Sequence, residues 1–258
     1  MRPSPDETLS KVPKITLAYW IIKIAATTLG ETGGDALSMT MDFGYALSTV
    51  IFFGFFLVAM AAQIRARAFQ PFLYWSVIVA TTTAGTTMAD FADRSLGIGY
   101  IGGSVALLVI VLATLATWRF ALGSVSVAHI ASPKVEAFYW ATILFSNTLG
   151  TALGDYLADD SGLGYEGGAL VFGAALALLA VTYLLTAGSR TVLFWLAFIL
   201  TRPLGATVGD LLTKPHDAGG FDLSRVSSSL VIGVFMAGCI LSVWRRQAAG
   251  PAQREQST

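Results

Sequence analysis

Four aspartates occupy equivalent positions within strongly apolar segments of the chain. Each lies fifteen residues after a tryptophan, and they are Asp35, Asp90, Asp155 and Asp210. A charged side chain inside a bilayer costs several kcal/mol unless it is paired, hydrated or bound to an ion. Carboxylates at membrane depth therefore indicate ion or proton pathways. We predict that these four aspartates bind a metal cation or carry protons.

Further polar residues share the helical face of each aspartate, because residues four apart lie on one side of a helix. Going back four and then eight positions gives Glu31 and Thr27, Thr86 and Thr82, Thr151 and Asn147, and Ala206 and Arg202, of which only Ala206 breaks the polar pattern. Carboxylate, amide and hydroxyl oxygens are hard ligands, which suit Mg²⁺, Mn²⁺ or Ca²⁺ better than soft metals. We therefore add Glu31 and Asn147 to the predicted cation or proton ligands.

The charges inside these apolar segments do not balance. Glu31 and the four aspartates give five negative charges, whereas Lys23 and Arg202 give two positive ones, which leaves three negative charges. We expect Arg202 to pair with a carboxylate, and Lys23 either to pair similarly or to extend toward the cytoplasm. The negative surplus favours a cationic guest or shared protons.

A stripe of small residues runs beside the polar one. A glycine follows each of the four tryptophans by ten residues, and these glycines are Gly30, Gly85, Gly150 and Gly205. Small residues at four-residue spacing let helices approach closely in lipid, so we expect these glycines at helix–helix contacts. The aspartates could alternatively end a broken span and cap the next helical turn. That role is compatible with ion binding.

These positions belong to a unit that occurs four times. Its marker is an aromatic residue followed by tryptophan, at spacings of 55, 65 and 55 residues, in the pairs Tyr19-Trp20, Tyr74-Trp75, Tyr139-Trp140 and Phe194-Trp195. The four copies cover about residues 17–69, 72–120, 137–187 and 191–245. Each copy contains two apolar segments, so all copies enter the membrane in the same direction, as parallel repeats.

The composition is typical of a membrane protein. Of the 258 residues, 55% are hydrophobic and 12% are charged, whereas a soluble domain has about 25% charged residues. A helix that crosses a bilayer needs roughly 20 apolar residues. Eight segments have this length, so we predict an all-α bundle with spans at about 17–38, 43–64, 72–92, 99–120, 137–157, 164–186, 191–212 and 226–244.

Lysine and arginine are unevenly distributed between the two ends of these spans. Eleven lie on the side of the chain termini and three on the other side, so both termini are expected in the cytoplasm. We predict a cytoplasmic tail over 1–16, a single membrane domain over 17–245 and a flexible cytoplasmic tail over 246–258. The single cysteine excludes a disulfide framework, and no long basic run indicates nucleic acid.

The four aromatic–tryptophan pairs carry a resemblance to a known family. The chain resembles uncharacterised bacterial integral membrane proteins that are built from four tandem two-helix repeats, each with a characteristic tryptophan. The resemblance covers about residues 15–245. It implies a bacterial inner-membrane protein and supplies no activity.

The leading hypothesis is a secondary transporter for a hard divalent cation such as Mn²⁺. Export is the expected direction, with protons exchanged through the same carboxylates. One alternative is a non-transport membrane scaffold or partner subunit in which the aspartates cap helices, and another is a passive cation channel. The sequence contains no nucleophile motif, zinc-binding helix pair or nucleotide-binding loop, so we expect neither an enzyme nor a cofactor. The expected partners are the lipid bilayer, the inorganic cation and protons.

Overall fold

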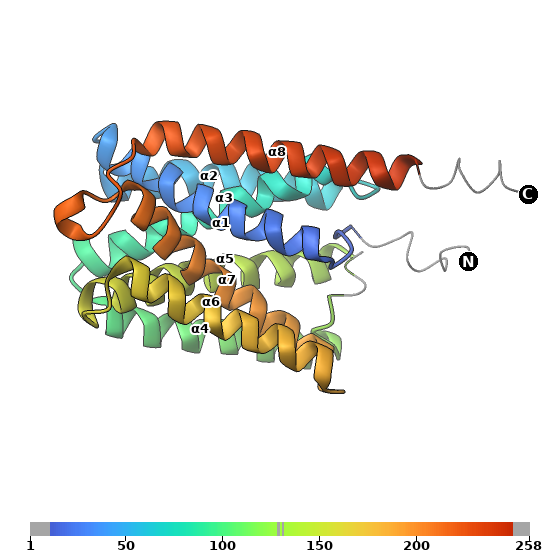
Figure 1. Ribbon diagram of the computed structural model, residues 1–258. Helices are drawn as coiled ribbons and strands as arrows, with labels where there is room; N and C mark the ends of the chain where they lie inside the picture. Colours follow the sequence, from blue (N-terminus) through green and yellow to red (C-terminus); the bar gives the residue numbers. More distant parts are fainter. Residues whose placement is uncertain (1–10, 128–129, 131, 250–258) are drawn as a thin grey trace, which may run out of the picture.

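A computed structural model describes residues 11–127, 130 and 132–249. In these residues the chain forms eight long α-helices and no strand. The helices are α1 (Leu17–Asp35), α2 (Gly44–Arg65), α3 (Pro71–Asp90), α4 (Tyr100–Leu122), α5 (Pro133–Asp155), α6 (Gly164–Leu185), α7 (Arg190–Thr213) and α8 (Arg225–Ala249). Each coincides with a predicted span, so the all-α fold of four two-helix repeats is confirmed (Figure 1). Residues 1–10 and 250–258, within the predicted tails, lie outside the described residues.

The odd-numbered helices form a closed ring, in which α1 and α5 each contact both α3 and α7. The even-numbered helices lie outside this ring, where α2 packs against α3, α4 against α5, α6 against α7, and α8 against α1. The second helix of each repeat therefore packs on the first helix of the next repeat, and α8 closes the circle. The described part of the chain begins and ends at the same end of the bundle (Figure 1).

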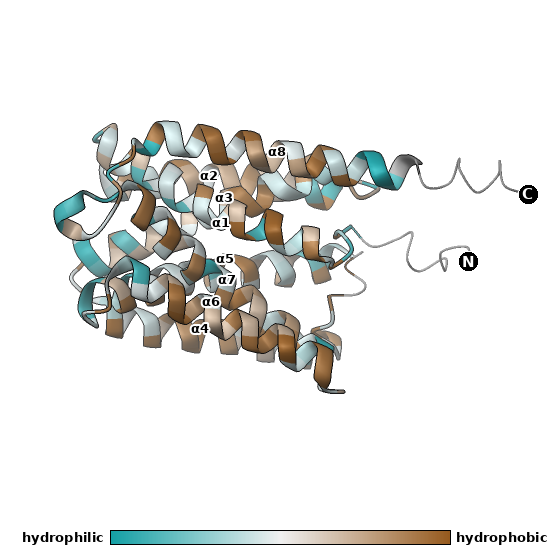
Figure 2. Cartoon of the chain, viewed as in Figure 1, coloured by the Kyte–Doolittle hydropathy of each residue, from teal (hydrophilic) through white to brown (hydrophobic). Residues whose placement is uncertain are grey.

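Five helices, namely α2, α4, α6, α7 and α8, are long and apolar enough to span a membrane. Figure 2 shows hydrophobic residues along the outer helices α4 and α6. In the most apolar stretch of α4, 11% of the residues are buried, whereas in that of α7 56% are buried. The difference arises because α7 belongs to the ring. The inner helices α1, α3 and α5 are less apolar because they carry polar stripes. These stripes are buried inside the ring.

Local sequence sets where the inner helices begin. The hydroxyls of Thr16, Ser132 and Ser189 accept hydrogen bonds from backbone N–H groups in the first turns of α1, α5 and α7. Such capping satisfies donors that the helix leaves unpaired. Helix α3 begins at Pro71, whose fixed φ suits the first helical position. Each inner helix thus begins shortly before its aromatic–tryptophan pair, at what we call the tryptophan end of the ring.

The tryptophans join neighbouring repeats at this end. The aromatic residue before each tryptophan packs against the tryptophan of the next repeat, and the fourth repeat closes on the first. The ring centroids are 5.4 Å apart for Tyr19 and Trp75, 5.5 Å for Tyr74 and Trp140, 6.3 Å for Tyr139 and Trp195, and 5.8 Å for Phe194 and Trp20. Aromatic pairs at such separations contribute about 0.5–1.5 kcal/mol each beyond their burial. We call this arrangement the aromatic circle.

Three inner helices continue into a π-helical turn directly after their aspartate. These turns are η1 (Ala36–Thr40), η2 (Phe91–Ser95) and η3 (Tyr156–Asp160), whereas α7 is followed by the 3₁₀ turn η4 (His216–Ala218). The aspartates before the three π turns have helical backbone angles and make no capping hydrogen bond. The helix-capping alternative is therefore not found in these three copies. Turns of the π type frequently occur at functional sites.

Candidate functional site

The repeat glycines lie where neighbouring inner helices come closest. A Cβ atom at any of them would press against the next inner helix, in the pairs Gly30 and Thr82, Gly85 and Asn147, Gly150 and Arg202, and Gly205 and Thr27. One turn further along, Gly34 faces Thr86 and Gly209 faces Glu31. The small stripe of each helix thus receives the polar stripe of its neighbour. This packing directs the polar stripes into the interior of the ring.

The interior of the ring is polar and almost inaccessible to solvent. The exposed fraction is 0% for Lys23, Asn147 and Arg202, 3% for Glu31 and between 1% and 3% for the four aspartates. Charged groups removed from water to this degree require partners. The partner of each charge therefore decides what it can do.

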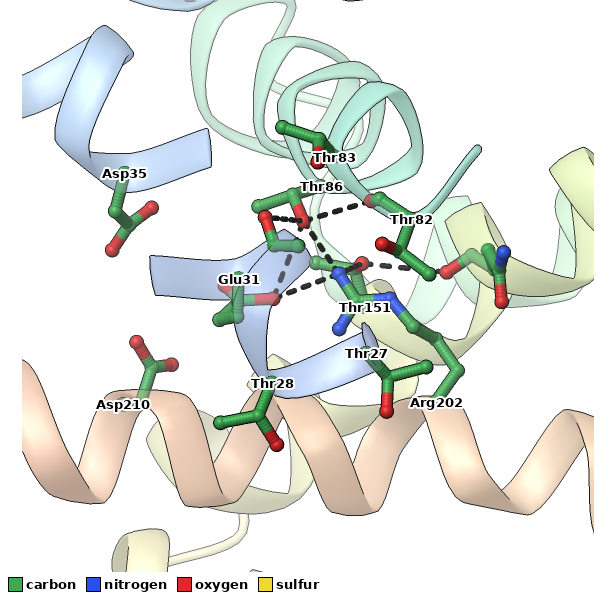
Figure 3. A network of polar contacts seen from close by, with 12 residues as sticks. Thr27, Thr28, Glu31, Asp35, Thr82, Thr83, Thr86, Thr151, Arg202 and Asp210 are labelled. Carbon is green, nitrogen blue, oxygen red and sulfur yellow. Dashed lines mark hydrogen bonds and ion pairs between the residues drawn. The ribbon is translucent and has the colours of Figure 1, made fainter. Parts of the chain in front are cut away.

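Arg202 extends across the ring and contacts the three other inner helices. Its Nη2 atom donates hydrogen bonds to Glu31 Oε2 at 2.8 Å, to Thr151 Oγ1 at 2.7 Å and to the Thr86 hydroxyl (Figure 3). The carboxylate beside Arg202 is thus Glu31. The other terminal nitrogen and the Nε atom of Arg202 have no hydrogen-bond acceptor among the described residues.

Lys23 has no carboxylate partner among the described residues, contrary to one expectation, and it does not extend toward solvent. Its Nζ atom lies 3.2 Å from Asn147 Oδ1, to which it donates, and 4.1 Å from the centre of the Phe198 ring. The Asn147 amide nitrogen donates to Thr81 Oγ1 at 2.9 Å. Asn147 therefore holds Lys23, which differs from its predicted role as a cation ligand.

Asp35 and Asp210 share a lysine at the opposite end of the ring. Lys214 Nζ lies 3.1 Å from Asp210 Oδ1 and 3.3 Å from Asp35 Oδ2. Arg225, the first residue of α8, adds its Nε atom 3.5 Å from Asp35 Oδ2. We call Asp35, Asp210 and Lys214 the Lys214 cluster. It joins the fourth repeat to the first.

Asp90 and Asp155 share an arginine in the same way. Arg94 Nε lies 3.2 Å from Asp90 Oδ1, and its Nη2 atom lies 3.4 Å from Asp155 Oδ2 and 3.6 Å from Asp159 Oδ2. We call Asp90, Asp155 and Arg94 the Arg94 cluster, which joins the second repeat to the third. The four aspartates thus form two pairs, each with its own cation.

Both shared cations stay charged because of their neighbours. Burial alone would lower the pKa of Lys214, but Asp210 and Asp35 outweigh it and raise that pKa above its ordinary value. Burial also opposes the charged form of Arg94, and Asp90 and Asp155 raise its pKa in spite of it. At neutral pH the Lys214 ammonium and the Arg94 guanidinium are therefore charged.

The negative surplus expected from the sequence is reduced by cations from the connections. Five basic residues lie in or against the ring, as many as its five acidic residues, although Lys23 contacts Asn147 and no carboxylate among the described residues, and Arg94 also contacts Asp159. The five basic residues are Lys23, Arg94, Arg202, Lys214 and Arg225. The predicted span boundaries placed Arg94, Lys214 and Arg225 in the connections between spans. In the structure their side chains lie against the aspartates.

The spacing of the two missed cations contains a signal that would have found them. Arg94 and Lys214 each follow an aspartate by four residues, the spacing at which opposite charges meet on a helix. The equivalent positions in the first and third copies are Met39 and Asp159. Only alternate copies carry a cation there, so the fourfold sequence repeat has a twofold pattern of charge.

Glu31 adds a third carboxylate beside the Lys214 cluster. One oxygen from each of Glu31, Asp35 and Asp210 lies within 4.8 Å of the other two. Figure 3 shows Asp35 and Asp210 directed toward one another beside Glu31. Hard cations bind oxygen at about 2.0–2.6 Å, so oxygens at these separations can share one ion. The Arg94 cluster and Asn147 are not part of this candidate metal site.

Comparison with protein families gives four matches along the chain. Residues 18–69, 73–123, 138–189 and 193–249 each match the family described as "Repeat of Unknown Function (DUF347)". These bounds agree with the four predicted copies, and the chain belongs to this family. Neither a curated protein nor a solved structure matches it.

Proposed function

We propose that this member of the repeat family is a secondary transporter of a hard divalent cation, such as Mn²⁺, in a bacterial inner membrane. The expected direction is export, with protons exchanged through the same carboxylates. One observation carries the proposal, namely that three buried carboxylates, Glu31, Asp35 and Asp210, lie together inside a closed ring of helices. Buried acids at membrane depth are typical of ion pathways.

The charge of this group fits a divalent cation. Glu31, Asp35 and Asp210 supply three negative charges, and the fully buried Arg202 neutralises one of them through its 2.8 Å contact with Glu31. One divalent ion in place of Lys214 and Arg225 would neutralise the remaining two. Lys214 and Arg225 reach the aspartates from the more exposed end of the ring, where their side chains are 11% and 22% exposed.

Side chains close the ring between this group and the tryptophan end. Arg202 spans the ring to Thr86 and Thr151, and Lys23 spans it to Asn147. The aromatic circle closes the ring beyond them. Transporters of this kind open a central site to one side at a time. We assign these side chains to the barrier on the cytoplasmic side.

The distribution of basic residues supports this orientation. Of the lysines and arginines outside the predicted spans, the sequence assigns eleven to the side of the tryptophans and three to the other side. Positive residues gather on the cytoplasmic side of inner-membrane proteins. The five apolar helices supply the lipid-facing surface. Export would then move the ion from the tryptophan end toward the aspartates.

Metal flux into liposomes tests the proposal. The purified protein would be reconstituted with a Mn²⁺-sensitive dye inside, and Asp35→Asn and Asp210→Asn should each lower the flux roughly tenfold or more, because each removes one charged ligand. The matched control is Asp160→Asn, which changes an exposed acid at the same end and should leave the flux unchanged. Full flux in folded Asp35→Asn and Asp210→Asn proteins would rule the proposed site out.

A pH gradient separates proton exchange from a passive channel. In an exchanger, an acidic liposome interior drives Mn²⁺ inward as protons leave, and reversing the gradient reverses the effect. A passive channel would follow the membrane potential and ignore the pH gradient. The same liposomes and the same dye serve for both measurements.

A non-transport scaffold is the second candidate, and the balance of five acidic with five basic residues favours it. In a scaffold the ion pairs would serve only to join neighbouring repeats. The Asp35→Asn and Asp210→Asn proteins would then lose thermal stability, while the unchanged protein would show no Mn²⁺ flux above protein-free liposomes. That pair of results would favour the scaffold over the transporter.

A further inference from the structure

We propose that Lys214 is a tethered cation that competes with the metal ion for Asp35 and Asp210, whereas Arg94 is a fixed partner of the equivalent aspartates. This inference rests on the proposed function, and it concerns how the same site is held when no metal is bound. The two clusters look alike in sequence. Their contacts differ in ways that assign them different roles.

The Lys214 ammonium lies where a bound cation would lie. A single atom, Nζ, contacts a carboxylate oxygen of Asp210 at 3.1 Å and one of Asp35 at 3.3 Å. The same two side chains, together with Glu31, form the candidate metal site. Two positive charges at one position repel each other strongly inside a protein. Metal binding therefore requires the ammonium to leave.

A second observation shows that the lysine uses only part of the site. The Asp35 side chain is only 1% exposed, and its Oδ1 atom accepts no hydrogen bond from any described residue. Figure 3 shows this carboxylate directed toward Asp210 and Glu31. An unpartnered buried acceptor is unfavourable. A metal ion can bind oxygens of all three carboxylates, so it satisfies the site more completely than the lysine does.

The backbone of Lys214 is fixed while its side chain can move. Its N–H donates to Asp210 O at 2.7 Å, and its carbonyl accepts from Asp222 N at 2.9 Å. Gly220 packs directly against that carbonyl, where a Cβ atom would not fit. The ammonium, by contrast, is carried on a flexible four-carbon stem. Because 11% of the side chain is already exposed, rotation of the stem can return the ammonium to solvent without unfolding the loop.

Arg94 is more exposed than Lys214, at 28% of its side chain, and Asp90 Oδ2 also has no hydrogen-bond partner among the described residues, but Arg94 is held at more points. Its Nε atom contacts Asp90, its Nη2 atom contacts Asp155, and its Nη1 atom donates to Tyr45 Oη at 3.3 Å. Its guanidinium also lies 5.8 Å from the centre of the Tyr100 ring. A planar group with several directed contacts is harder to displace than a single ammonium. The Arg94 cluster therefore joins repeats two and three permanently.

The matched variants Lys214→Gln and Arg94→Gln test this difference. Purified proteins would be heated in detergent with and without Mn²⁺. Both variants should melt at lower temperature than the unchanged protein when Mn²⁺ is absent, because each leaves two carboxylates without their cation. Mn²⁺ should then raise the melting temperature of Lys214→Gln more than that of the unchanged protein, and it should not do so for Arg94→Gln. Direct titration should show Mn²⁺ binding about tenfold tighter to Lys214→Gln.

Labelling of the unchanged protein gives an independent readout if Lys214→Gln fails to fold. Mn²⁺ should increase the reaction of Lys214 with an amine-specific ester, measured by mass spectrometry. Lys134 is exposed in either case and serves as the control. If the unchanged protein binds Mn²⁺ but neither Lys214 labelling nor Lys214→Gln affinity rises, Lys214 is no competitor and the transporter proposal stands alone. If the unchanged protein neither binds nor moves Mn²⁺, both proposals are wrong.

Discussion

The buried carboxylates of the ring differ in the cation that lies beside them. Glu31 lies beside the fully buried Arg202, the Asp35 and Asp210 pair lies beside Lys214, and the other aspartates lie beside Arg94. The three cations differ in burial and in the number of atoms that contact partners. One repeated aspartate therefore has different chemistry in different copies, which a fourfold pattern alone would hide.

The buried pair of Arg202 and Glu31 provides a residue-scale prediction. Arg202→Gln should destabilise the protein by about 3–5 kcal/mol, because it removes the cation that pairs with the buried Glu31 side chain. The measurement is unfolding of the purified protein in detergent. The double variant Arg202→Gln with Glu31→Gln should recover most of the lost stability, since no unpaired charge remains. Costs that simply add in the double variant would contradict this pairing.

The sequence predicted the carboxylates of the site and the pairing of Arg202 with one of them, but it did not predict Lys214 as a partner. Glu31 and Asp35 follow from the four-residue stripe of α1 and Asp210 from the equivalent stripe of α7, and the structure brings them together. Lys214 escaped prediction because it lies beyond the apolar span, and its partner Asp35 is 179 residues away. Asn147 was predicted as a ligand because its oxygen lies on the right stripe. Only the arrangement of helices around the ring shows that Lys23 uses that oxygen.

The elements that position the site are four inner helices packed through glycine. Because the small stripe of one helix receives the polar stripe of the next, the same contact both joins the helices and orients the polar side chains. The outer helices contact the ring from outside. Close packing thus sets the level and direction of each ligand.

Two glycines in different elements should respond oppositely to the same change. A Cβ atom at Gly30 would collide with Thr82 on the next inner helix, so Gly30→Ala should cost about 1–3 kcal/mol through overpacking. Gly54 lies on α2 with nothing near its Cβ position, so Gly54→Ala should be neutral or stabilising by about 0.5–1 kcal/mol. Thermal unfolding in detergent measures both. A loss of stability in Gly54→Ala equal to that in Gly30→Ala would show that glycine flexibility, not packing, matters.

At the element scale the sequence was more informative than at the residue scale. Span lengths, aromatic–tryptophan spacing and glycine stripes fixed the eight helices and the packing faces of the inner four, because those features are local or periodic. The π turns after three aspartates were not predicted, since hydropathy does not distinguish them from the end of a broken helix. The position of α8 against α1 also depends on closure of the ring, which no local pattern specifies.

The whole molecule combines a fourfold arrangement of helices with a twofold arrangement of charge. Each half of the chain contains one repeat with an aspartate alone and one with an aspartate followed by a cation four residues later. Both clusters form across the boundary between halves, because the Lys214 cluster joins repeats four and one and the Arg94 cluster joins repeats two and three. Neither half contains a complete cluster. The candidate metal site likewise needs Glu31 and Asp35 from one half and Asp210 from the other.

This sharing predicts how two separate halves of the protein behave. A break after Gly123 falls in an exposed connection at the tryptophan end, so both fragments keep two helices per repeat and the same orientation. When the fragments are produced together, the boundary contacts and the aromatic circle should hold them together, and a tag on one should retain the other during purification. The joined fragments should move Mn²⁺ into liposomes, and either fragment alone should not. Asp210→Asn in the second fragment should stop the flux while leaving the fragments associated, which separates loss of the site from loss of assembly. Comparable Mn²⁺ flux from one fragment alone would mean that the site does not need both halves, because no single fragment supplies all three carboxylates.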